Sequence, residues 1–172
     1  METKINSYHG LFFVISIVLV GITGVGFLYW RESIKNGRLS ISRSNLELIG
    51  HACDEYRTVN GVLPQYENDS RRSLWLLYPD FVFDGVFWNP RAEFPRPENA
   101  SIFEDKDKRL VSSAYLESTG YMYFPECANT PNAILVAESK SIDGGRLVLR
   151  RDGSVSWLKD AELPDAIKEN TH

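Results

Sequence analysis

The feature that most constrains this chain is an uncharged run of twenty residues, 11–30, near its N-terminus. As an α-helix at about 1.5 Å per residue, the run extends about 30 Å, the thickness of the hydrocarbon layer of a bilayer. Tyr29 and Trp30 stand at its end, and their amphipathic rings favour the membrane interface. A cleaved signal peptide has a shorter apolar region followed by small residues, whereas this run ends in bulky ones. The sequence therefore predicts an uncleaved single-pass transmembrane helix.

Composition limits the function classes. The 172 residues are 43% hydrophobic and 24% charged, which is ordinary for a globular protein of one domain's length. The net charge of −4 supplies no general basic field, so nucleic acid is not expected as a partner. Two cysteines and three histidines are too few for most metal sites and histidine-based catalysis. Since no phosphate-binding loop or nucleophile elbow occurs either, we predict a non-enzymatic protein without catalytic, cofactor-binding or metal-binding residues.

The helical pattern continues beyond the apolar run. No proline occurs between Arg31 and Pro64, and apolar residues recur at steps of three and four. This apolar stripe consists of Leu46, Ile49, Cys53 and Tyr56. Asn60-Gly61 is typical of a helix end. We therefore predict an amphipathic helix over 31–61 whose stripe packs on a soluble domain.

The middle of the chain is harder to interpret. Residues 73–83 are dense in large apolar side chains and are predicted to be buried. Periodicity does not decide whether the first part is a short helix capped near Asp69 or Ser70. The other segments are a proline-containing loop over 89–99, a solvated charged loop over 104–109 and a short aromatic strand over 121–124.

The C-terminal part has the clearest strand pattern. Residues 133–138 (AILVAE) predict a short apolar strand, and Asp143-Gly144-Gly145 predicts a turn. Two further runs then flank Asp152-Gly153, which is a hairpin signal.

Two loop lengths fit this hairpin, and the apolar pattern decides between them. A two-residue loop at Asp152-Gly153 would place Leu149 opposite Ser156. A three-residue loop, with the glycine in the left-handed region, places Leu149 opposite Val155. We predict the second register because it gathers four apolar residues on one face, namely Leu147, Leu149, Val155 and Trp157.

This face and the apolar stripe can cover each other. The predicted fold class is therefore α+β, with a long N-terminal helix, its first half transmembrane, packed on a small C-terminal antiparallel β-sheet. The predicted organisation is a short segment 1–10, a transmembrane helix 11–30, an amphipathic helix 31–61, a soluble α+β head 62–160 and a tail 161–172.

A few polar residues admit more than one interpretation. Asp143 and Asp152 lie beside glycines, where turn chemistry is favoured over a small calcium site. Glu138 is interpreted as the solvated end of a strand. Cys53 and Cys127 could form a disulfide, but two buried thiols are favoured. His51 is two residues from Cys53 and, since such residues face apart on a helix, the two form no catalytic dyad.

Several stretches occur in an order known from one family. Residues 45–64 (NLELIGHACDEYRTVNGVLP) are similar to the family stretch NLxxIGxAxxxYxxxxGxLP. Towards the end, residues 144–158 (GGRLVLRRDGSVSWL) are similar to the closing strands GGRxVLxxDGxVxxL, preceded by 120–123 (GYMY) and 133–138 (AILVAE). Together they resemble the type IV pilins and type II secretion pseudopilins of bacteria.

The resemblance implies a pilin-like structural or assembly protein of the bacterial cell envelope. Its implied partners are the membrane bilayer and other pilin-like or secretion proteins, with no cofactor. The chain departs from the family's processing signature, since Leu11 follows Gly10 and Ile15 stands at the glutamate position. The alternative is a standalone membrane-anchored binding domain with a pilin-like fold, outside any pilus or secretion machine.

Two arguments on orientation disagree. Only Lys4 precedes the apolar run among the basic residues, whereas Arg31, Lys35, Arg38 and Arg43 follow it, which places the head in the cytoplasm. The resemblance implies an exported head on the bacterial inner membrane. We predict the exported, periplasmic orientation.

Overall fold

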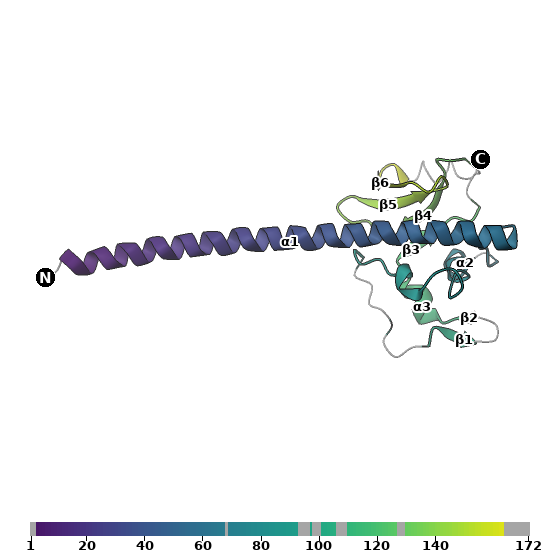
Figure 1. Cartoon of the computed structure of the whole chain (residues 1–172), viewed down its shortest axis with the longest axis horizontal. Helices are drawn as coiled ribbons and strands as arrows, with labels where there is room; N and C mark the ends of the chain where they lie inside the picture. The colour runs from purple at the N-terminus through teal and green to yellow at the C-terminus, as the bar shows by residue number, and fades with distance from the viewer. Residues whose placement is uncertain are drawn as a thin grey trace. The chain divides into compact units, whose positions relative to one another are not determined.

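A computed structural model describes residues 3–67, 69–92, 97, 101–105, 110–126 and 130–163, with side chains at Phe13 and from Ser16 onward. The chain divides into two compact units, Met1–Arg38 and Leu39–His172. Helix α1 (Thr3–Asn60) contributes to both. The second unit, called the head below, also holds a four-stranded antiparallel sheet (Figure 1). The predicted α+β class, a long N-terminal helix with a small antiparallel sheet, is confirmed.

The remaining elements are short. They are α2 (Ser70–Trp75), the 3₁₀ helix η1 (Asp84–Phe87), β1 (Phe103–Asp105), β2 (Leu110–Val111), α3 (Ser113–Ser118), β3 (Tyr121–Tyr123), β4 (Ile134–Glu138), β5 (Gly145–Arg150) and β6 (Val155–Lys159). The four-stranded sheet has the order β3-β4-β5-β6, and β1 pairs with β2 separately. In Figure 1, β4, β5 and β6 lie on one side of the C-terminal half of α1, and α2, α3, β1 and β2 on the other.

The predicted apolar stripe of α1 is buried. Leu46, Ile49 and Cys53 are 0% exposed, and Tyr56 is half-buried against the same core. The helix ends at Asn60 as expected, because Gly61 adopts a φ of +78° and its N–H closes the last turn onto the Arg57 carbonyl at 2.8 Å.

The sheet places alternate residues of β5 in two cores. Leu147 and Leu149 join the main core with the stripe of α1, whereas Val148 packs with Ile134 and Leu158 in a second core. This alternation follows from the period of two in a strand. Both faces of the sheet therefore bury apolar side chains.

Helix and sheet approach each other closely at Gly50. A methyl group added at this glycine would lie 3.2 Å from Cδ2 of Leu149, which is tighter than ordinary van der Waals contact. A glycine that weakens the isolated helix by about 1 kcal/mol thus permits the sheet to pack directly on the helix backbone.

The predicted hairpin register is confirmed. Leu149 pairs with Val155 and Leu147 with Trp157 across a three-residue loop, in which Gly153 has a φ of +85°. One part of the prediction is wrong, because Trp157 is 41% exposed rather than part of the buried face. Its ring instead covers the guanidinium group of Arg91, with the Arg91 Cζ 4.9 Å from the ring centroid.

The middle of the chain answers one open question and brings one correction. Asp69 caps α2 by accepting hydrogen bonds from the amides of Arg71 and Arg72, both at 3.0 Å. The loop predicted over 104–109 is wrong at its start, because residues 103–105 form strand β1. The ring of Phe103 packs on Tyr78, with centroids 5.7 Å apart, and holds this strand to the head. Residues 106–109 lie outside the described part of the chain.

The packing of α1 on the sheet gives a first prediction. In a fragment of residues 31–172, Ile49→Ala and Leu149→Ala should each lower the free energy of unfolding by about 2–5 kcal/mol, because each empties a fully buried site. The exposed control Glu47→Ala should change it by no more than about 0.5 kcal/mol. Urea unfolding measures the free energy of unfolding of all three variants. If the two core variants lose no more than the control does, the packing of α1 on the sheet is wrong.

Candidate functional site

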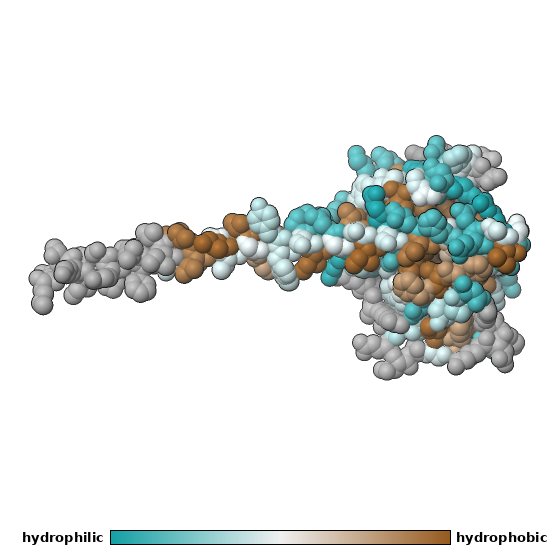
Figure 2. Space-filling model, viewed as in Figure 1, coloured by the Kyte–Doolittle hydropathy of each residue, from teal (hydrophilic) through white to brown (hydrophobic). Residues whose placement is uncertain are grey.

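The described side chains of the first unit up to Trp30 are mostly apolar and exposed. Every large hydrophobic side chain described between Phe13 and Trp30 is between 52% and 75% exposed. Figure 2 shows these hydrophobic residues gathered along this part of α1. Within the described range 16–60, α1 is long and apolar enough to cross a membrane, judged by length and composition. A membrane anchor and a signal sequence both have this character.

The head contains a buried carboxylate, Glu138, at the end of β4. It is 0% exposed, so its interpretation as a solvated strand end is wrong. Its Oε1 accepts hydrogen bonds from Ser42 Oγ at 2.6 Å and Asn89 Nδ2 at 2.9 Å. Its Oε2 accepts from Arg91 Nη1 at 2.7 Å and from the backbone amide of Leu147 at 2.8 Å. These five residues are called the Glu138 cluster below.

The segment after η1 supplies the charge partner. Asn89 Oδ1 accepts from the amide of Arg91 at 2.9 Å, which shapes the turn that directs the arginine inward. The Arg91 side chain is 7% exposed, and its guanidinium group lies between the carboxylate and the ring of Trp157. Gly120 allows the turn to fit, because a methyl group there would lie 2.5 Å from the Asn89 backbone nitrogen.

Helix α1 reaches this cluster through two polar residues. Besides donating to Glu138, Ser42 has its hydroxyl oxygen 3.4 Å from that of Tyr121. Asn45 donates to the Trp88 carbonyl at 3.0 Å and so holds the same turn. Burial raises the pKa of Tyr121 to about 12, so the phenol stays protonated even in moderately alkaline solution.

The geometry of the Glu138 cluster suits a structural role. A carboxylate has about four acceptor positions, and all of them are used here by donors from three segments, namely α1, the 88–92 turn and β5. A saturated, buried carboxylate is held in one place and has no free position with which to accept a substrate proton. The cluster therefore ties α1, the 88–92 turn, β4 and β5 together.

The sequence analysis did not predict this cluster, because it placed Glu138 in solvent and assigned no role to Ser42 or Arg91. One signal was present: Ser42 lies four residues before Leu46 and therefore extends the apolar stripe by one turn with a polar residue. A polar residue on a buried stripe needs a partner, and an acidic residue ending an apolar strand is a suitable one.

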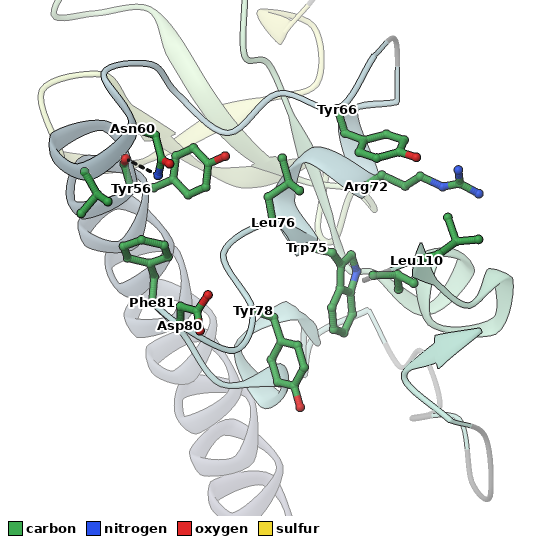
Figure 3. Close-up of a pocket in the computed structure, with 12 residues that line it drawn as sticks. Tyr56, Asn60, Tyr66, Arg72, Trp75, Leu76, Tyr78, Asp80, Phe81 and Leu110 are labelled. Atoms are coloured by element: carbon green, nitrogen blue, oxygen red, sulfur yellow. Dashed lines mark hydrogen bonds between the residues drawn. The ribbon is translucent and has the colours of Figure 1, made fainter. Parts of the chain in front are cut away.

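A cleft lies between the end of α1, α2 and β2 (Figure 3). Its volume is about 280 Å³, and aromatic rings dominate its lining, with Tyr56, Tyr78 and Phe81 among them. Arg72 and Asp80 add one charge of each sign. The described residues that line it include no histidine, cysteine, serine or threonine. Its chemistry suits binding of an apolar or aromatic group.

The remaining candidates do not come together in one site. Asp143 and Asp152 lie in the turns at opposite ends of β5, so they cannot share an ion. Asp152 accepts from the Ser154 hydroxyl and amide, and these hydrogen bonds lower its pKa. Among the described residues no group of three or more potential ligands gathers to hold a metal. His51 is exposed, and Cys53 is buried while Cys127 lies outside the described residues, so the disulfide stays a hypothesis.

No protein-family model, curated protein or solved structure matches this chain.

The Glu138 cluster yields a second prediction. In the 31–172 fragment, Arg91→Ala should lower the free energy of unfolding by about 3–5 kcal/mol, because it leaves a buried carboxylate without its counter-charge. The matched control is Arg57→Ala, which removes an exposed pair with Asp54 of similar length, 3.0 Å, and should cost at most about 1 kcal/mol. Urea unfolding at neutral pH compares the two. Equal losses in the free energy of unfolding would contradict the prediction, because they would show that the buried pair of Arg91 stabilises the head no more than an exposed pair does.

Proposed function

We propose that this chain is a membrane-anchored, pilin- or pseudopilin-like structural protein of the bacterial cell envelope, acting through protein contacts and not as an enzyme. The observation that carries the proposal is the packing of an apolar stripe of α1 on a small antiparallel sheet, in a helix whose N-terminal part is apolar enough to cross a membrane. One helix thus provides both an anchor and part of the core of the head.

The residues that carry the family resemblance have physical roles in this fold, which supports the proposal. Gly50 permits the contact with Leu149, and Gly61 ends the helix with a positive φ. Gly145 lies under the indole of Trp157, where a methyl group would be 2.7 Å from the ring. Gly153 makes the hairpin turn. Matching glycines at positions where a side chain is strained or excluded are stronger support than matching surface residues.

The proposed location is the bacterial inner membrane with the head in the periplasm, and other pilin-like or secretion proteins are the proposed partners. The transmembrane anchor proposed for residues 11–30 would be uncleaved within the apolar run. Processing, if it occurs, would fall after Gly10.

A second candidate is a standalone anchored binding domain. The aromatic cleft favours it, because a cleft of about 280 Å³ with two opposite charges in its lining is large enough for a side chain of a partner. Leu11 and Ile15, which depart from the family signature, favour it too.

The third prediction separates the two candidates. Protein extracted from carbonate-washed membranes should begin at Leu11 if it is processed like a prepilin, and Edman or mass-spectrometric sequencing of the N-terminus measures this. Gly10→Val is the matched control, because a branched residue before the scissile bond should block cleavage and leave the first ten residues in place.

The outcomes differ for the two candidates. A wild-type chain that keeps its first ten residues in the membrane favours the standalone binding domain. Quantitative release of the wild-type protein into the carbonate wash would refute the membrane anchor and with it both candidates.

A further inference from the structure

Three basic residues follow the apolar run on one face of α1. Arg31, Lys35 and Arg38 are spaced by four and then three residues, so at about 100° per residue they fall within an arc of about 60°. All three are exposed. They are called the basic face below.

The apolar run sets the depth of this face if it spans a bilayer. Tyr29 and Trp30, which are 75% and 60% exposed, end the run at the expected level of the membrane interface. The eight residues 31–38 extend about 12 Å further, and the headgroup layer on one side of a bilayer is about 5–8 Å thick. The long stems of arginine and lysine cover the remaining distance, because such side chains reach along a helix towards the interface.

The charge of the rest of the chain makes the basic face distinctive. Residues 39–172 hold 21 Asp and Glu against 15 Lys and Arg, so the head is net acidic. Residues 31–38 hold three basic residues and a single acidic one, Glu32. An anionic membrane surface therefore repels the head as a whole and attracts this short segment.

We propose that the basic face binds the phosphate groups of anionic phospholipids in the leaflet where the apolar run ends. The proposal rests on the membrane anchor proposed above, but it holds for either orientation of the head. Arginine can contact a phosphate through two parallel N–H groups, and lysine adds a point charge. Each basic residue near a membrane surface strengthens binding about fivefold.

The experiment is native mass spectrometry of the full chain in a neutral detergent, with phosphatidylglycerol and phosphatidylcholine offered at equal concentrations. The wild-type chain should retain phosphatidylglycerol at least about tenfold in preference to phosphatidylcholine, and the preference should fall as salt is raised. The triple variant R31Q/K35Q/R38Q should bind the two lipids about equally.

The matched control is R71Q/K140Q/K159Q, which removes the same number of charges from exposed positions in the head. It should keep the wild-type preference. Equal retention of the two lipids by the wild-type chain would overturn the basic face while leaving the membrane anchor intact. If the control variant lost its preference for phosphatidylglycerol to the same extent, the basic face would be overturned too, because the preference would then depend on net charge alone. Release of wild-type protein from carbonate-washed membranes would instead refute the anchor itself.

Discussion

The buried ion pair between Glu138 and Arg91 is the interaction on which the head depends. Removing two charges from water costs several kcal/mol per ion, and the attraction between them offsets this only when the geometry is good and the other acceptor positions are filled. Here the remaining positions are filled by Ser42 from α1, Asn89 from the turn and the Leu147 amide from β5. All of these segments must be in place together, which makes the fold of the head cooperative.

The polar cluster and the apolar core have different tasks. The core of leucine, isoleucine and aromatic side chains supplies most of the free energy, but apolar contacts alone tolerate sliding of a helix over a sheet. The hydrogen bond from Ser42 to Glu138 can form in only one position of α1 along the sheet, and so can the contact between Gly50 and Leu149. We infer that these two points, two helical turns apart, set the register of α1 on the sheet.

Elements that depend on residues close together in the sequence could be predicted from the sequence. The hairpin register follows from the period of two and a glycine at the turn, and the end of α1 follows from Asn60-Gly61. The interior of the head could not be predicted, because it depends on distant residues. Glu138 is buried only because Arg91, 47 positions away, and Ser42, 96 positions away, meet it. Trp157 packs one face of its ring on that same arginine and not on the apolar core, so it remains partly exposed. No local pattern records such pairings.

The central claim is that the C-terminal half of α1 and the sheet form one cooperative unit. Native-state hydrogen exchange of the full chain in detergent tests it most directly, because it measures the opening free energy of each amide. The account predicts that amides between Leu46 and Tyr56 exchange only with the same global opening as those of β4 and β5. Helix amides that open at a free energy several kcal/mol below that of the sheet would contradict it.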